Sequence, residues 1–177
     1  IDCVGDWDEW RGKTLTKIAA RKGHLACLRS AHESGCKLHR SCADLAALNG
    51  SLECLQYAHK NGCDLNERTC AMAASGNNLE CLKYARDNDC QWDKETCEEA
   101  AANGSLECLQ YAHKNGCKWD KWTCTRAAER GQLKCLQYAH ENGCAWDEST
   151  CFHASRCGHL DCLEYAHANN CPCEHVK

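Results

Sequence analysis

Cysteine and histidine recur at regular spacing in this sequence, and both can bind metal ions or act in catalysis. Two series of six cysteines, Cys27 to Cys162 and Cys36 to Cys171, have successive members 27 residues apart. Most members of the second series follow a histidine by four residues, as Cys117 follows His113. Residues four apart share one face of a helix. The spacing therefore raises three possibilities, namely zinc coordination, disulfide bonding and Cys–His catalysis.

Distance along a helix limits which of these residues can meet. Cys108 and Cys117 would lie about 13 Å apart on one helix, whereas a zinc–sulfur bond measures about 2.3 Å. We therefore expect Cys108 to be a small buried apolar residue. His113 and Cys117 could instead meet Cys124 across the junction to the next repeat, and Cys90 could likewise meet Cys97. The candidate zinc ligands are His32, Cys36, Cys42, His59, Cys63, Cys70, His113, Cys117, Cys124, His140, Cys144, Cys151, His167 and Cys171, the last with Cys173 or His175.

Two departures from the pattern count against zinc: Arg86 replaces the histidine of the third repeat, and Cys42 stands one residue out of register. Reduced cysteines that pack in the core are the favoured alternative. Disulfides are a third, although Cys108 would lack a partner within the Cα distance of about 7 Å that a disulfide needs. This favours a reducing compartment, so we expect an intracellular, cytoplasmic protein. The alternative role for each histidine is a ring nitrogen hydrogen-bonded to a carbonyl of the next repeat.

Catalysis is the least favoured reading of the Cys and His residues. A Cys–His nucleophile needs one shaped pocket and a third group that orients the base. Near-copies of the same Cys–His pair in successive repeats are typical of a scaffold. We therefore predict that the protein is not an enzyme, and we expect no cofactor apart from the possible zinc.

The regular spacing arises from an internal repeat. Asn103–Cys117, NGSLECLQYAHKNGC, recurs unchanged at Asn49–Cys63. A strict period in this range is typical of stacked repeat arrays. We divide the chain into a lead-in or partial repeat (1–11), a tail (174–177) and one solenoid domain at 12–173. The six repeats of the solenoid are 12–38, 39–65, 66–92, 93–119, 120–146 and 147–173.

Each repeat is predicted to form two helices, as the fourth repeat illustrates. Asp93 is a suitable N-cap for a helix over 94–103, and Ser105 for a second helix over 106–115. Apolar residues in both segments recur at helical spacing, and Gly116 suits the left-handed conformation at a helix end. No segment alternates with a period of two. The predicted fold is an all-α solenoid of six stacked antiparallel helix pairs.

The same residues resemble an ankyrin repeat. The likeness lies in Ala100-Ala101, Gly104, Leu106-Glu107-Cys108-Leu109 and Asn115-Gly116-Cys117. Ankyrin repeats have about 33 residues, so these shorter units would lack the projecting β-hairpin. The junction Gly116-Cys117-Lys118-Trp119-Asp120 is more similar to the shortened, Cys- and Trp-rich ankyrin-like arrays of protists and giant viruses. The resemblance implies a helical solenoid that binds proteins and performs no chemistry.

Comparison of the six repeats locates a candidate binding surface. The second helix hardly varies, whereas the first helix varies in charge and size at its non-alanine positions. Solenoids place successive first helices along one extended concave surface. The predicted partner-binding residues are Lys17, Arg21, Asp44, Leu48, Met72, Glu98, Glu99, Arg126, Arg130, Phe152, His153 and Arg156. Their charges suit an acidic or mixed-charge protein partner.

The net charge and the lengths of the apolar stretches disfavour further classes of function. The net charge is −4 with no basic run, which disfavours nucleic-acid binding. No apolar stretch approaches the roughly 20 residues that span a bilayer, and Ile1–Trp10 lacks the pattern of a signal peptide. The absence of an initiator Met indicates a fragment or a processed chain. We predict a monomeric, non-enzymatic protein-interaction scaffold, with a thiol-rich zinc-binding array as the alternative.

Overall fold

The computed structural model describes residues 4–173, with side chains from Gly12 onward. The described part of the chain is helical and contains no strand. Its helices are α1 (Val4–Arg21), α2 (Leu25–Glu33), α3 (Cys42–Asn49), α4 (Leu52–Lys60), α5 (Glu67–Ser75), α6 (Leu79–Asp87), α7 (Lys94–Ala102), α8 (Leu106–Lys114), α9 (Lys121–Glu129), α10 (Leu133–Glu141), α11 (Glu148–Cys157) and α12 (Leu160–Ala168). The prediction of an all-α chain of paired helices is confirmed. None of these helices has the length and apolar character needed to cross a bilayer.

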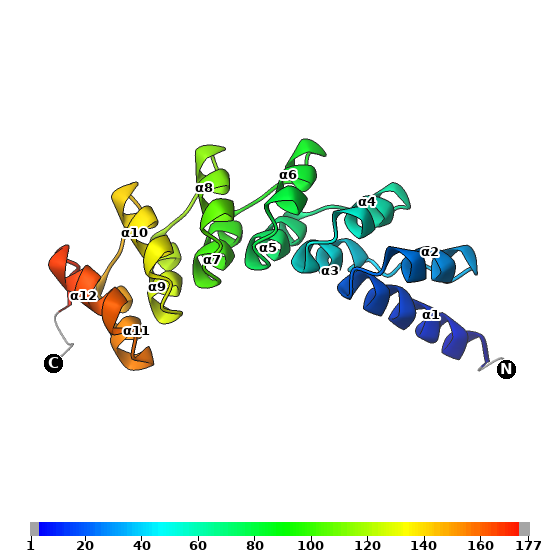
Figure 1. Ribbon diagram of the computed structural model, residues 1–177, viewed down its shortest axis with the longest axis horizontal. Coiled ribbons are helices and arrows are strands. Elements are labelled where there is room, and N and C mark those ends of the chain that lie inside the picture. Colours follow the sequence, from blue (N-terminus) through cyan, green and yellow to red (C-terminus); the bar gives the residue numbers. More distant parts are fainter. Residues whose placement is uncertain (1–3, 174–177) are drawn as a thin grey trace.

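The helices form two rows that curve together (Figure 1). The odd-numbered helices line the inner, concave side, and the even-numbered helices lie on the outer, convex side. Each odd-numbered helix packs against the next odd-numbered helix and against the even-numbered helix that follows it. Contacts between neighbouring outer helices are less extensive. Because the inner helices approach more closely, the stack bends toward them.

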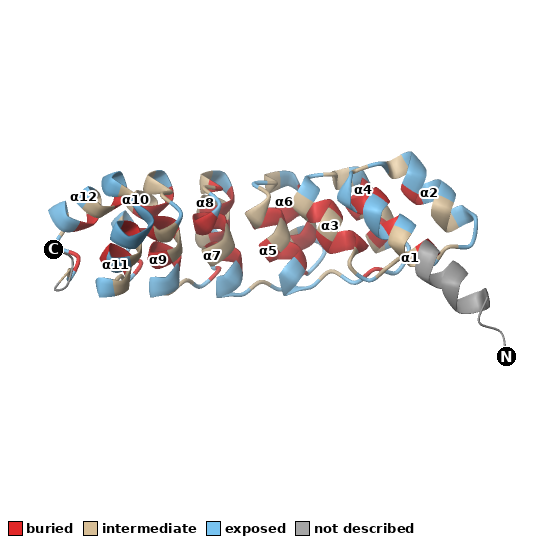
Figure 2. Cartoon of the chain, turned by 90° about the horizontal axis from the view of Figure 1, so that it is seen from below, coloured by how far each residue is buried: buried red, intermediate tan, exposed pale blue. Residues whose placement is uncertain are grey.

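The core lies between the two rows along the whole array (Figure 2). In the fourth repeat, Ala100 and Ala101 of α7 meet Leu109 and Ala112 of α8, and all four are fully buried. Alanine lets the helices come close, and the leucine supplies most of the apolar surface. Burial of one such leucine contributes about 2 kcal/mol. Cys108 is also fully buried, as predicted.

Local signals determine where the helices begin and end. The Asp93 carboxylate accepts a hydrogen bond from the Glu95 N–H at 3.0 Å, which confirms the predicted N-cap. Gly116 has φ +83°, the left-handed conformation that glycine adopts without steric cost. The predicted boundaries of both helices extend one residue past the observed C-terminal ends of α7 and α8.

The prediction for Ser105 is wrong. Ser105 occupies the N-cap position of α8, but its side chain accepts no capping hydrogen bond, and its buried hydroxyl has no partner. The backbone closes this turn instead. The Ser105 N–H donates to the Ala100 carbonyl at 2.9 Å, and its carbonyl accepts from the Leu109 N–H at 2.9 Å.

The first helix is longer than predicted. α1 runs without interruption for 18 residues from Val4 to Arg21, so the expected lead-in and the first repeat share one helix over the described residues. Ile1–Cys3 lie outside the described part of the chain. A Cβ at Gly12, inside this helix, would lie 3.0 Å from the Cys36 sulfur. Glycine at this position therefore leaves room for the end of the first repeat to pack against α1.

Candidate functional site

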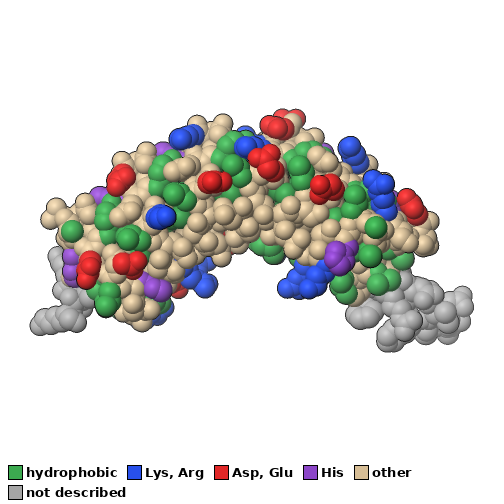
Figure 3. Space-filling view, viewed as in Figure 1, with side chains coloured by type: hydrophobic (Ala, Val, Ile, Leu, Met, Phe, Trp, Pro, Cys, Tyr) green, Lys and Arg blue, Asp and Glu red, His purple; other side chains and the backbone are tan. Residues whose placement is uncertain are grey.

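The residues predicted to bind a partner lie on the odd-numbered helices or, for Arg130, directly after α9. These helices line the concave side, where Figure 3 shows Lys and Arg side chains projecting at two places. Among the predicted residues, Lys17, Arg21, Arg130, Phe152 and Arg156 are exposed, whereas Leu48, Met72, Glu98, Glu99, Arg126 and His153 are half-buried. These eleven residues, together with Arg68 and Trp122, are called the inner strip below.

Polar contacts connect the inner helices at the centre of the strip. The Ser75 hydroxyl donates to Glu99 at 3.1 Å. Arg126 lies 3.7 Å from Glu99 and 3.4 Å from Glu129. Ion pairs at a partly exposed surface contribute only about 0–1 kcal/mol each. Their charged groups can therefore exchange these contacts for those of a bound protein at little cost.

Two large aromatic side chains stand out at the C-terminal end of the strip. Trp122 on α9 is 44% exposed and Phe152 on α11 is 51% exposed. Trp122 lines a hollow of about 490 Å³ together with Glu98, Arg126 and His153. Burial raises the pKa of Glu98, and the Nδ1 atom of His153 is buried without a hydrogen-bond partner. This end of the strip therefore combines exposed aromatic surface with a buried polar atom that has no partner.

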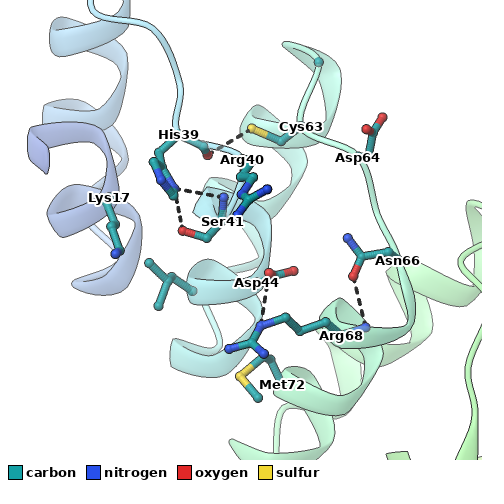
Figure 4. Close-up of a pocket in the computed structure, with 12 residues that line it drawn as sticks. Lys17, His39, Arg40, Ser41, Asp44, Cys63, Asp64, Asn66, Arg68 and Met72 are labelled. Atoms are coloured by element: carbon teal, nitrogen blue, oxygen red, sulfur yellow. Dashed lines mark hydrogen bonds and ion pairs between the residues drawn. The ribbon is translucent and has the colours of Figure 1, made fainter. Parts of the chain in front are cut away.

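A second hollow, of about 640 Å³, lies toward the N-terminal end between α1, α3 and α5 (Figure 4). Lys17, Arg40 and Arg68 contribute positive charge to its lining. His39 is held by hydrogen bonds between its Nδ1 atom and both the hydroxyl and the N–H of Ser41. Burial and then the charge of Lys17 lower the pKa of His39. Three positive side chains thus face two carboxylates, those of Asp44 and Asp64, around this hollow.

Asp44 does not belong to the exposed surface. Only 7% of it is exposed, because its carboxylate accepts a hydrogen bond from the Thr69 hydroxyl at 2.8 Å and lies 3.6 Å from the Arg68 guanidinium. Asp44 thus joins α3 to α5. The sequence did not identify Arg68, the exposed partner of Asp44, or Trp122 as surface residues of this strip. For Trp122, the available signal was a large apolar side chain within the first turn of an inner helix.

The histidines make a repeated contact between neighbouring repeats. His113 Nδ1 shares a hydrogen bond with the hydroxyl of Tyr138 at 3.0 Å, and the His113 ring stacks on Trp119 with centroids 3.7 Å apart. The pairs His32–Tyr57, His59–Tyr84 and His140–Tyr165 repeat the hydrogen bond at 2.9 to 3.0 Å. The partner in the next repeat is a tyrosine hydroxyl, where the sequence suggested a carbonyl.

Arg86 fills the histidine position of the third repeat in a similar way. Its guanidinium carbon lies 4.1 Å from the centre of the Trp92 ring, and its Nη1 atom donates to the Cys90 carbonyl. Both imidazole and guanidinium are flat groups that stack on an indole. The position thus requires a flat, polar group over the tryptophan, which explains how arginine is tolerated.

The cysteines pair within a repeat and not across the junction. Cys70 Sγ lies 3.2 Å from Cys90 Sγ in the third repeat, and similar thiol contacts join three other pairs, Cys42–Cys63, Cys97–Cys117 and Cys124–Cys144. The two helices of a repeat are antiparallel, so the start of the first and the end of the second lie together. That antiparallel arrangement was the signal that could have identified the pairs.

Each pair also bonds to the backbone. Cys117 donates to the Asp93 carbonyl at 3.1 Å, and Cys144 donates to the Asp120 carbonyl at 3.1 Å. The hydrogen bond with Cys117 and burial raise the pKa of Cys97 well above its usual range. These thiols therefore connect the N-cap of the first helix to the end of the second.

The predicted grouping of ligands across the junctions is wrong in geometry. Within the described residues, no set of the His113–Cys117–Cys124 kind brings three donor atoms within 4.8 Å of one another. This holds equally for the sets at His32, Cys36 and Cys42, at His59, Cys63 and Cys70, and at His140, Cys144 and Cys151. In the last repeat, His167 is exposed, Cys171 lies near Cys151 and Cys173, and His175 is outside the described residues.

Comparison with known proteins agrees with this architecture. Residues 43–121 match the family model described as ankyrin repeats (3 copies). Residues 43–121 are thus identified as ankyrin repeats. It is similar in fold to the human ASB11 ankyrin repeat domain, with a TM-score of 0.71 and 15% sequence identity over 92% of this chain and 86% of that chain. No curated protein matches the sequence.

Ankyrin repeats are generally protein–protein interaction modules. In this chain, the connection from α8 to α9 covers only residues 115–120 and contains no strand. The concave side is therefore formed by the inner helices and these short connections. A partner on that side would meet the inner strip directly.

Proposed function

We propose that this ankyrin-repeat array is a non-enzymatic scaffold that binds another protein along the inner strip. The observation that supports this most is the exposure of Trp122 beside Arg126 and of Phe152 beside Arg156. Tryptophan and arginine are enriched among the residues that dominate binding energy at protein interfaces. The core is built mainly of alanine, cysteine and single leucines. Packing of the core therefore does not require these exposed aromatic rings.

The charges along the strip favour a partner with acidic groups at one end. Around the N-terminal hollow, Lys17, Arg40 and Arg68 outnumber Asp44 and Asp64. Glu98 and Glu99 lie at the centre of the strip. Complementary charge accelerates association and determines orientation more than it adds affinity. We expect a partner segment that carries carboxylates near α1 to α5 and an apolar anchor near α9 and α11.

The repeated Cys and His side chains support a scaffold over an enzyme. The pairs of cysteines bond to each other and to backbone carbonyls, and the histidines bond to tyrosines of the next repeat. Such contacts use these groups to join helices. Most of the described cysteines are free thiols, which suits action in a reducing compartment such as the cytoplasm.

Quantitative binding of a captured partner tests this proposal. The wild-type chain would be used as bait, and the Kd of each captured protein measured for wild type and for an inner-strip variant with Arg126→Ala, Arg130→Ala, Phe152→Ala and Arg156→Ala. Loss of one aromatic or arginine residue that anchors an interface typically costs more than about 1 kcal/mol of binding free energy. We expect binding at least tenfold weaker, about 1.4 kcal/mol or more.

An outer-surface variant provides the matched control. Lys60, Lys114 and Glu141 are exposed on α4, α8 and α10, and replacing all three with alanine should leave the Kd unchanged. Circular dichroism should show that both variants are folded. Equal binding by the inner-strip variant, or a loss confined to the outer-surface variant, contradicts the proposal.

The alternative function, a zinc-binding array, is supported at one place only. Four repeats bring two cysteine sulfurs together, which is two fewer than the usual ligand number of a structural zinc site. The last repeat differs, because it holds three. A zinc ion at every junction between repeats therefore has less support than a single zinc site in the last repeat.

A further inference from the structure

The last repeat contains a cluster of three sulfurs. Cys151 lies on α11, and Cys171 and Cys173 follow α12. Their sulfur atoms all lie within 4.8 Å of one another, with Cys151 and Cys171 buried and Cys173 half-buried. Cys151 and Cys173 are joined as a disulfide, with Cα atoms 5.7 Å apart. Within the described residues, this is the only group of three possible metal donors at this spacing.

Comparison with the other repeats shows how the third sulfur arises. Cys171 donates to the Asp147 carbonyl at 3.3 Å, as Cys144 does to Asp120. Two residues further on, earlier repeats carry Trp119 or Trp146, whereas the last repeat carries Cys173. The additional sulfur therefore stands where the other repeats place an apolar side chain.

We propose that Cys151, Cys171 and Cys173 form a site for one thiophilic metal ion, with Zn²⁺ as the principal candidate. Zinc bound about 2.3 Å from each sulfur holds the sulfurs about 3.8 Å apart. The sulfurs of Cys151 and Cys173 must therefore separate on reduction, which their Cα distance of 5.7 Å permits. Three thiolates leave one position open for water, and soft thiolate ligands also suit Cu(I). The bound ion would join the start of α11 to the segment that follows α12, and so would close the C-terminal end of the stack.

The disulfide and the metal are alternative states of the same sulfurs. An external dithiol reduces the Cys151–Cys173 bond, giving two thiols here and a disulfide in the reductant. The three thiols then bind M²⁺ as thiolates and release three protons. Oxidation removes two of the three ligands, so metal binding requires the reduced form.

Equilibrium dialysis of the full chain against Zn²⁺, with a phosphine reductant present, tests the site. We expect about one zinc ion per chain by elemental analysis, and a rise in Tm on zinc addition. In Cys173→Ser that ion and the rise in Tm should be lost. In Cys157→Ser, which changes an exposed cysteine at the end of α11, both should remain.

Each outcome bears on the proposal. Absence of bound zinc in wild type, with Cu(I) also unbound in a parallel dialysis, overturns it. Retention of the full equivalent by Cys173→Ser also overturns it, because the ion then occupies one of the two-cysteine pairs. Binding of Cu(I) but not Zn²⁺ supports the site and identifies its metal. Circular dichroism of Cys173→Ser, and of Cys173→Ala as a second variant, separates loss of the ligand from loss of the fold.

Discussion

The outer row at α8 and α10 and the inner row at α7 and α9 use their polar side chains differently. On the outer row, His113 stacks on Trp119 and bonds to Tyr138, and His140 repeats this contact one repeat later. On the inner row, Glu98 and Glu99 of α7 are followed by Thr125 and Arg126 at the corresponding positions of α9. The outer row repeats one contact, and the inner row changes from helix to helix.

This difference separates two tasks within one fold. A contact between neighbouring repeats must be made many times in the same geometry, so its residues recur. A surface that recognises one partner needs different side chains at different places along the stack. We infer that the outer row mainly supports stability and that the inner strip mainly supports binding. The following predictions test that division.

The largest effect should come from the leucine that both rows share. Leu109→Ala removes a fully buried side chain between α7 and α8, and such changes cost about 2–5 kcal/mol. The free energy of unfolding in urea should fall by that amount. Leu160→Ala on α12 is the matched control, because Leu160 is 65% exposed, and it should cost well under about 1 kcal/mol.

Removing one hydroxyl from the outer row should have a smaller effect. Tyr138→Phe deletes the hydrogen bond to His113, and such a loss costs about 1 kcal/mol. Tyr111→Phe is the matched control, because Tyr111 occupies the same place opposite Arg86 and Trp92, where no histidine is available. Urea unfolding should show a greater loss for Tyr138→Phe, and equal losses would contradict the role of the His–Tyr bond.

The outer row should also make stability depend on pH. Burial and then the charge of Lys114 lower the pKa of His113 in the folded state. The unfolded chain therefore takes up a proton at higher pH, near the usual histidine pKa of about 6.5. Stability should be complete above that pH and should decrease as the pH falls through it. Urea midpoints between about pH 7.5 and pH 5.5 should vary less in His113→Gln than in wild type.

Changes on the inner strip should hardly affect folding. Arg126→Ala removes ion pairs to Glu99 and Glu129 at a partly exposed site, so the free energy of unfolding should change by less than about 0.5 kcal/mol. The same variant should weaken partner binding. A loss of stability comparable to that of Tyr138→Phe would show that the two rows do not divide their tasks as proposed.

A small effect is also expected when the histidine of one repeat is replaced by the arginine found at the same position of another repeat. His113→Arg places at Trp119 the group that Arg86 presents to Trp92. Stacking on the indole should replace stacking of imidazole, although the bond to Tyr138 changes, and the free energy of unfolding should shift by less than about 1 kcal/mol. A larger loss would indicate that imidazole chemistry, and not a flat polar shape, is required at this position.

Much of the fold could be read from the sequence because its determinants are local. Asp93 caps α7 through a hydrogen bond to a residue two positions away, and Gly116 ends α8 through its own backbone conformation. The apolar spacing around Leu109 requires only helical periodicity. The 27-residue period then indicates that each helix pair packs on a copy of itself. These features predicted the helices, their pairing and the solenoid.

The tertiary structure decided which side chains meet. Cys97 could pair with Cys90, seven residues earlier, or with Cys117, twenty residues later, and the return of α8 beside α7 selects Cys117. Enclosure of Asp44 and exposure of Trp122 likewise depend on the neighbouring helix. Periodicity determines the face on which a side chain lies. Which residues it contacts depends on the position of a second helix. The spacing of residues along one helix gives no information about that position.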